Sequence, residues 1–284
     1  MADTVAIAGR GRAIALFGGI GRTGKFLAPA VGGILAAAYG LRAPFLLFGV
    51  ACLLTLTLIV IFVKVLPNAT HLPRGQIHHL YTTLKNNYRL LGVAGAGQIF
   101  AQMIRAGRDV IIPLFGADVL GLEVQQIGFI MSVGSAIDMS LFYPAGMIMD
   151  RLGRKFAIVP SFAIQTFAMG LVPLTAGFSG LLFVTGLIGF GNGLGSGTMM
   201  TLSADLAPAN ARGEFLGVWR LIGDIGSSGA PIVVGGVAGL VALPTAAVVM
   251  SGAGLIAVII FAFFVPETLK KQIQIVAATE PGVQ

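Results

Sequence analysis

The feature that most constrains this chain is a series of eight apolar stretches, each close to the length that crosses a membrane. They cover approximately residues 13–37, 43–65, 91–116, 125–149, 156–176, 181–202, 215–241 and 243–265. A helix needs about 20 apolar residues to span the hydrocarbon core of a bilayer. Strands of a membrane barrel would be about half as long and would alternate in polarity. The sequence therefore predicts an all-α integral membrane bundle with eight transmembrane helices.

The composition excludes a soluble protein. Only 10% of the residues are charged and 56% are hydrophobic, whereas a soluble domain carries about 25% charged residues. The net charge of +7 is therefore interpreted as a signal of membrane topology, and no nucleic-acid partner is expected. Lys and Arg accumulate in the loops that remain in the cytoplasm.

The basic residues outside the spans fall almost entirely on one side of the predicted membrane. That side holds Arg10, Arg12, Lys64, Arg74, Lys85, Arg89, Arg151, Arg154, Lys155, Arg212, Lys270 and Lys271, and the other side holds Arg42. This bias predicts a multi-pass protein of the plasma or inner membrane, with both chain ends and the loop 66–90 in the cytoplasm.

The chain also contains an internal repeat. Residues 2–33 align without gaps to residues 204–235, and the pairs include Asp3 with Asp205 and Pro29 with Pro231. Internal repeats of this size are typical of secondary transporters. Four predicted spans lie between the loop 66–90 and the second copy, whereas none precedes the first copy. We therefore expect the first half to lack four helices.

Two motifs that suggest other activities are rejected. Residues 19–25 resemble a phosphate-binding loop, but Phe26 stands where Ser or Thr should hold Mg²⁺, and the match lies inside a span. No nucleotide is expected. Ser179 lies in a G-x-S-G sequence, but all three histidines lie in the loop 66–90, on the other side of the membrane. A serine protease needs a base beside its nucleophile, so no enzyme is predicted. No metal or other cofactor is expected either, because His, Cys and acidic residues form no group at ligand spacing.

Two short motifs carry a family resemblance. "GMIMDRLGRK", residues 146–155, resembles the G-x-x-x-D-R-x-G-R-[RK] loop signature of the major facilitator superfamily through Gly146, Asp150, Arg151, Gly153, Arg154 and Lys155. "GKFLAPAVGG", residues 24–33, is similar to the antiporter signature of that superfamily through Gly24, Pro29, Gly32 and Gly33. Ala28 replaces one glycine of that signature. "FVPET", which ends at Thr268, is similar to the end of the last helix in many members.

The resemblance implies that the spans correspond to helices five to twelve of a twelve-helix fold. Residues 1–65 would then be the remainder of the N-terminal half and residues 66–90 the central cytoplasmic loop. Residues 91–268 would be the six-helix C-terminal half, followed by a cytoplasmic tail, 269–284. The loop signature would act as a conformational latch. Gly146 would permit close helix contact, and Asp150 would cap the start of the first span near Gly11. The three basic residues of the signature would meet anionic lipid.

Charged residues within the spans are the candidate substrate and coupling residues. Burying a charge in a bilayer is costly unless the charge is paired or hydrated, so such residues usually face a functional cavity. They are Arg22, Lys25, Arg105, Arg108, Arg220, Asp109, Asp138 and Asp224. Local pairing of Arg105 with Asp109 and of Arg220 with Asp224 is weighed evenly against a substrate role for these four. The excess of cations favours an anionic solute. Asn192 and Thr198 are further cavity candidates, although helix packing is the favoured reading of their Gly-rich stretch.

Asp138 or Asp224 is the expected proton carrier. From their predicted depths, Asp138 and Arg22 lie near the middle of the bilayer, so Asp138 is predicted to pair with Arg22 or Lys25. Together these patterns predict a secondary transporter of a small organic solute that exports its substrate in exchange for protons. The alternative is a truncated fragment without transport activity, or a partner subunit.

Overall fold

The computed structural model describes residues 10–62, 85, 88–207 and 212–269, and within these it leaves the side chains of residues 10–22, 25 and 90 undescribed. The described chain is helical and contains no strand. Its α-helices are α1 (Arg10–Tyr39), α2 (Ala43–Phe62), α4 (Tyr88–Leu114), α5 (Val124–Ser140), α6 (Phe142–Arg151), α7 (Arg154–Leu171), α8 (Gly177–Leu194), α9 (Thr198–Leu206), α10 (Arg212–Leu240) and α11 (Leu243–Ile259). Short π turns, η2 (Phe115–Val119) and η5 (Ile260–Phe264), extend α4 and α11, and a 3₁₀ turn, η3 (Val172–Leu174), extends α7.

Six helical stretches of the described chain are long and apolar enough to cross a membrane. They are Ala43–Phe62, Val124–Arg151, Arg154–Leu174, Gly177–Leu206, Arg212–Leu240 and Leu243–Phe264. Two of the eight predicted spans are not among these six. Helix α4 is 27 residues long but carries Arg105, Arg108 and Asp109 in its second half. In α1, the apolar segment Phe26–Tyr39 is too short to count among the six. The all-α membrane bundle agrees with the expectation from the sequence.

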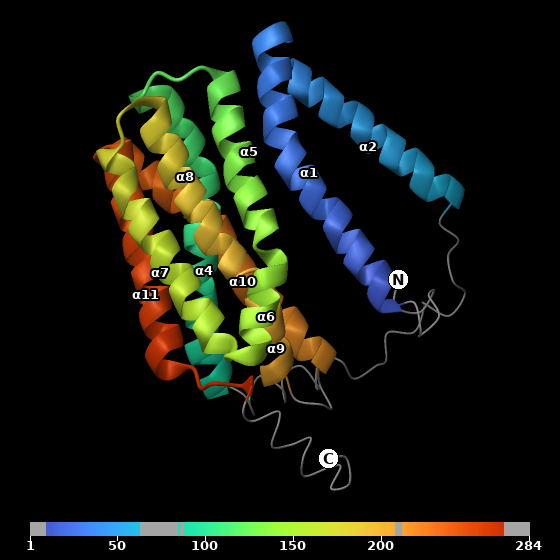
Figure 1. The fold of residues 1–284 in the computed structure, drawn as a ribbon, viewed down its shortest axis with the longest axis vertical. Helices are drawn as coiled ribbons and strands as arrows, with labels where there is room; N and C mark the ends of the chain where they lie inside the picture. The colour runs from blue at the N-terminus through green and yellow to red at the C-terminus, as the bar shows by residue number, and fades with distance from the viewer. Residues whose placement is uncertain (1–9, 63–84, 86–87, 208–211, 270–284) are drawn as a thin grey trace, which may run out of the picture.

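The described helices from α4 to η5 form one bundle (Figure 1). Around it, α5 packs on α8, α8 on α7, α7 on α11, α11 on α4, and α4 on α10. Helix α1 packs on the outside of this bundle against α5. Helix α2 leans away from α1, so that the two form a V beside the bundle. None of the residues of α2 is buried.

Glycines set the closest helix crossings. A Cβ added at Gly128 of α5 would lie 2.5 Å from the carbonyl oxygen of Pro29, and one at Gly33 would lie 3.1 Å from that of Val124. Between α5 and α8, a Cβ at Gly193 would lie 2.8 Å from the carbonyl oxygen of Asp138. In a bilayer, helices associate through small residues that let backbones approach. These glycines therefore allow α1, α5 and α8 to pack closely in one row.

Two of the membrane-length stretches are interrupted near their middle. The first breaks at Leu141, between α5 and α6, and the second breaks at residues 195–197, between α8 and α9. Gly197 has φ +79°, a left-handed conformation that glycine adopts without strain. Asp138 and Asn192 each lie two residues before the end of their helix, α5 and α8 respectively. Broken helices in transporters expose backbone groups at the binding site.

Candidate binding cavity

A polar cavity of about 410 Å³ lies between α4, α10 and the break that separates α8 from α9. Its volume falls within the range of about 300–1,000 Å³ that is usual for small-molecule sites. The residues that line it are Gln102, Arg105, Ala106, Arg108, Asp109, Asn192, Ser196, Gly197 and Ser227. Four of the sequence-predicted candidates, Arg105, Arg108, Asp109 and Asn192, therefore meet at one place.

Arg105 projects from α4 toward the broken stretch. Its Nη2 donates to the carbonyl oxygen of Gly195 at 3.3 Å, and its guanidinium lies 4.9 Å from the centre of the Phe162 ring. The Nε of Arg105 is shielded from solvent and has no hydrogen-bond partner among the described residues. A buried guanidinium donor without a partner is a strong site for an incoming anion.

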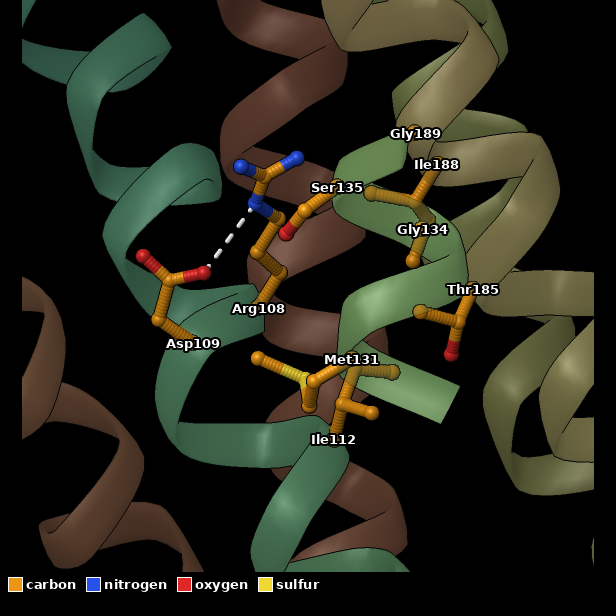
Figure 2. Close-up of a pocket in the computed structure, with 9 residues that line it drawn as sticks. All are labelled: Arg108, Asp109, Ile112, Met131, Gly134, Ser135, Thr185, Ile188 and Gly189. Atoms are coloured by element: carbon orange, nitrogen blue, oxygen red, sulfur yellow. Dashed lines mark hydrogen bonds and ion pairs between the residues drawn. The ribbon is translucent and has the colours of Figure 1, made fainter. Parts of the chain in front are cut away.

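Arg108, one turn further along α4, is held by its neighbour. Its Nε donates to Oδ1 of Asp109 at 3.2 Å, and the Arg108 side chain is 22% exposed. Figure 2 shows this pair on α4 facing Ser135 of α5, beside a second, small cavity of about 30 Å³. That space suits about one water molecule, so the larger cavity is the better candidate for a solute.

Asp138, on α5, contacts Asn192 of the cavity lining. Nδ2 of Asn192 donates to its Oδ2 at 2.8 Å. The other oxygens of both side chains, Oδ1 of Asp138 and Oδ1 of Asn192, are buried and have no hydrogen-bond partner in the described part of the chain. Asp138 also interacts electrostatically with Arg105. We call Arg105, Asp138 and Asn192 the central cluster.

The sequence left local ion pairing and a substrate role as equal alternatives for four residues, and the described residues do not form the local pairs. Asp109 pairs with Arg108, while Arg105 donates to Gly195, so the alternative pair Arg105–Asp109 is wrong. Arg220 and Asp224 both lie exposed on α10, and no ion pair between them is found among the described residues. Spacing by four residues permits such a contact, but tertiary partners compete for the charge. The side chains of Arg22 and Lys25 are undescribed, so their predicted pairing with Asp138 stays a prediction.

The sequence analysis missed Gln102, Ser196 and Ser227 in the cavity lining. Gln102 had a usable signal, because it lies one turn before Arg105 and two turns before Asp109 on one face of α4. Ser196 and Ser227 carry no such signal within their Gly-rich stretches. Thr198 is buried, and its Oγ1 donates to the carbonyl oxygen of Gly195, which supports the break between α8 and α9.

A second charged group, the turn network, lies where α6 turns into α7. Arg154 is its centre: Nε donates to Oδ2 of Asp205 at 3.0 Å, and Nη1 donates to Oδ1 of Asp150 and to the carbonyl oxygen of Met149. Thr268 donates to the same oxygen of Asp205 at 2.9 Å. The network therefore ties the ends of α6, α7 and α9 to the segment that follows η5.

Glu267 completes the turn network by capping α7. Its carboxylate accepts the backbone N–H groups of Arg154, Lys155 and Leu269 at 2.9–3.0 Å. Burial alone would raise the pKa of Glu267, but these backbone hydrogen bonds hold the pKa below its ordinary value. Gly153 at the turn has φ +116°, and a Cβ there would lie 2.7 Å from Oε2 of Glu267. Only glycine fits this position.

These contacts correct part of the reading of the loop signature. Arg154 is 8% exposed, so the expectation that it meets lipid is wrong. Lys155 is half-buried and donates through Nζ to the carbonyl oxygen of Ala262, and Arg151 is exposed, so lipid contact of these two residues stays a prediction. A Cβ at Gly146 meets no atom within 4 Å, so the expected close helix contact is absent from the described chain. Asp150 accepts a hydrogen bond from Arg154, and its side chain is 71% exposed. Its predicted capping of the first span near Gly11 involves residues whose side chains are undescribed, so it stays a prediction.

Some residues of the antiporter-like motif contact another helix and others do not. Pro29 and Gly33 lie in the contact between α1 and α5. A Cβ at Gly24 or Gly32 meets no atom within 4 Å. The half of the motif that touches another helix is thus its Pro-x-x-x-Gly part.

Comparisons with known proteins agree with this architecture. The profile of the Major Facilitator Superfamily matches residues 1–231 and, in a second match, residues 95–281. An uncharacterized MFS-type transporter of Methanocaldococcus jannaschii is 25% identical over 209 residues, which are 70% of this chain and 52% of that protein. A hexuronate transporter of Bacillus subtilis is 30% identical over 183 residues, which are 63% of this chain and 43% of that protein. The chain spans about half the length of the curated relatives it matches.

Each match of the family profile covers more than half of the 284 residues. The chain therefore belongs to the major facilitator superfamily, whose matched relatives are transporters. The resemblance found in the two short motifs is confirmed. Together with its six apolar helices, the family assigns this chain to the multi-pass membrane proteins.

Proposed function

We propose that this member of the major facilitator superfamily contributes the solute site of a secondary transporter for a small organic anion. The observation that carries the proposal is the polar cavity with two arginines, Arg105 and Arg108, halfway along the bundle. Charged groups at membrane depth are costly and mark solute pathways. A guanidinium binds a carboxylate through paired hydrogen bonds. The similarity to a hexuronate transporter makes a sugar carboxylate the first solute to test.

The remaining parts of the proposal follow from the sequence. Residues 1–65 belong to the N-terminal half, 66–90 form the central loop, 91–268 form the C-terminal half, and 269–284 form a tail. Both ends and the central loop face the cytoplasm of a plasma or inner membrane, as the positive charges indicate. Transport proceeds by alternating access around the cavity and is coupled to protons. Export by proton exchange is the direction that the sequence favours, and no cofactor or enzymatic step is involved.

The test of the anion site is direct binding. The chain is reconstituted in lipid nanodiscs and titrated with glucuronate, a hexuronate, and with glucose as the neutral control. We expect saturable binding of glucuronate alone, and at least a tenfold loss of affinity in Arg105→Gln, because a hydrogen bond to a charged partner is worth about 1.5–3 kcal/mol. Arg212→Gln, an exposed arginine outside the cavity, is the matched control and should bind normally. Equal binding of glucose, or an unchanged Arg105→Gln, would reject the anion site.

A second candidate, that this chain is a partner subunit or a truncated fragment, is favoured by one observation. On α1, Pro29 and Gly33 pack against α5. On α10, the repeat places Pro231 and Gly235 in the same pattern, yet a Cβ at Gly235 meets no atom within 4 Å. A further helix would fill that position. Sealed vesicles containing the purified chain distinguish the two candidates: gradient-driven glucuronate flux supports a transporter that works by itself, whereas binding without flux supports the subunit or fragment.

A further inference from the structure

A hollow on the side of the bundle differs from the polar cavity in its lining, which is largely apolar. We call it the side groove. It has a volume of about 340 Å³ and is lined by Ala30, Ile34, Gln125, Gln126, Phe129 and Phe178. These residues come from α1, α5 and α8, so the groove lies along the row that the three helices form.

The side groove faces away from the central cluster. Phe129 and Asp138 lie nine residues apart on α5, which is about two and a half helical turns and places them on opposite faces of the helix. The side chains of Ile34 and Phe129 are 54% and 53% exposed. An apolar hollow that is exposed at membrane depth is filled by lipid or by another apolar molecule, because the bilayer core holds no water.

The lining changes from polar to apolar with depth. Gln125 and Gln126 lie in the first turn of α5, at the end of the bundle drawn at the top of Figure 1. Oε1 of Gln126 accepts the backbone N–H of Glu123 at 3.0 Å, which holds this amide at the edge of the groove. One turn deeper, the ring of Phe129 stacks on Phe178 with the ring centres 6.3 Å apart. Amides above aromatic rings match a phospholipid, whose ester groups lie above its acyl chains.

Both signs of charge occur at this end of the bundle. Arg42 lies in the turn between α1 and α2, Glu123 directly precedes α5, and Asp118 lies in η2. All three are exposed, and none forms an ion pair within the described chain. A headgroup with a phosphate and an ammonium group can bind the guanidinium and a carboxylate at once. A headgroup with negative charge alone is repelled by the two carboxylates.

We propose that the side groove binds a zwitterionic phospholipid, with an acyl chain against Phe129 and Phe178 and the phosphate at Arg42. The lipid bridges α1, α5 and α8. It lies beside the closest crossing of α1 and α5, where a Cβ at Gly128 would lie 2.5 Å from the carbonyl oxygen of Pro29. The site is independent of the proposed anion site, because no residue lines both the side groove and the polar cavity.

Native mass spectrometry tests the site by counting the lipids that the chain retains. The purified chain is delipidated in detergent and titrated with phosphatidylethanolamine, and we expect saturable retention of a single molecule. Ala30→Trp fills the groove and should weaken retention by about tenfold, the loss expected when about two methylene groups lose their buried contacts. Ala28→Trp is the matched control, since Ala28 is exposed and lies about 200° around α1 from Ala30. Equal retention by the two variants would overturn the proposal.

Two further lipids test the headgroup. Monoolein has no charge, and phosphatidylglycerol has the phosphate without the ammonium group, so both should be retained more weakly than phosphatidylethanolamine. Arg42→Gln lies in an exposed turn and leaves the groove open; it should weaken retention of phosphatidylethanolamine by about threefold, the value of an exposed ion pair. Arg212→Gln, at the opposite end of the bundle, should behave as the wild type. Equal retention of the three lipids, or an Arg42→Gln variant that binds as the wild type does, would reject recognition of a zwitterionic headgroup and with it the proposed site.

Discussion

The helical bundle contains two clusters of charged residues, the turn network and the central cluster. They differ in how many of their hydrogen-bonding atoms have a partner. In the turn network, the Nε and Nη1 atoms of Arg154 bind Asp205, Asp150 and a backbone carbonyl at 2.9–3.0 Å. In the central cluster, Arg105 donates one hydrogen bond, to the carbonyl oxygen of Gly195 at 3.3 Å, and its Nε has no partner within the described structure. One arginine is surrounded by acceptors, and the other is left with capacity to bind.

The difference separates a structural role from a binding role. A fully satisfied polar network fixes the geometry of the helix ends it joins, and its parts have no free capacity. Buried polar atoms without partners raise the free energy of the folded chain, and a ligand or a proton that bonds to them lowers it. We therefore interpret the loop signature as the rigid part of the bundle, and the charges on α4 and α5 as its responsive part if the proposed anion site is correct. The predictions below test this contrast, beginning with the largest expected effect.

Replacing Arg154 should have the largest effect on stability. Arg154→Met strands the carboxylate of Asp205, whose side chain is 6% exposed, and loss of one partner of a buried ion pair costs about 3–5 kcal/mol. Unfolding of the purified chain in mixed detergent, followed by circular dichroism, measures the change. Arg151→Met, an exposed neighbour in the same turn, should change stability by less than about 0.5 kcal/mol. Equal effects of the two would remove the structural role assigned to Arg154.

Of the two glycines in the loop signature, Gly153 should lose more stability on substitution by alanine. Gly153→Ala places a Cβ 2.7 Å from Oε2 of Glu267 at φ +116°, and such strain costs about 1–3 kcal/mol. Gly146→Ala is the matched control, because it lies within α6 and its Cβ meets no atom within 4 Å. In the same unfolding assay, that control should be neutral or stabilising by up to about 1 kcal/mol. A destabilising Gly146→Ala would show that Gly146 packs against something the described chain does not contain.

Glu267 should make stability depend on pH in the acid range. Its pKa is lower in the folded chain than in the unfolded chain, so the carboxylate contributes stability above the unfolded pKa of about 4.3. That contribution is lost as the pH falls through the lower, folded pKa. Glu267→Gln should cost about 1.5 kcal/mol at neutral pH and should flatten the pH dependence of unfolding between about pH 6 and pH 3. A wild-type curve and a variant curve that stay parallel over this range would contradict the capping role.

Arg105→Met should have the smallest effect on stability, although it should abolish binding at the proposed anion site. The substitution removes a buried donor, Nε, that has no partner, and Arg105 forms no salt bridge among the described residues, so no carboxylate loses a bonded partner. Replacement of poorly paired buried charges by apolar residues is often neutral or stabilising, so we expect a change of less than about 1 kcal/mol, against about 3–5 kcal/mol for Arg154→Met. If both arginines cost the same, the contrast between the two groups is wrong.

The sequence by itself determined the class of structure and the family. Hydropathy is a local property, since a run of apolar residues needs no distant partner to be placed in a bilayer. The loop signature and the repeat are also contiguous in sequence, so they could be recognised without coordinates. For the same reason, Arg105, Arg108, Asp138 and Asn192 stood out individually, because each is a polar residue in an apolar run.

Only the tertiary structure decided which of these residues meet. Arg105, Asp138 and Asn192 come from α4, α5 and α8, and the contact from Asp138 to Asn192 joins residues 54 positions apart. Glu267 and Arg154 are 113 positions apart, and no motif joined them. Spacing along one helix suggested the pair Arg105–Asp109. In the packed bundle, Asp109 pairs with Arg108, and Arg105 donates to the carbonyl oxygen of Gly195. The choice among partners depends on how close the glycines let the helices approach and on where the broken helices expose their carbonyl groups. Those distances arise from the packing of the whole bundle.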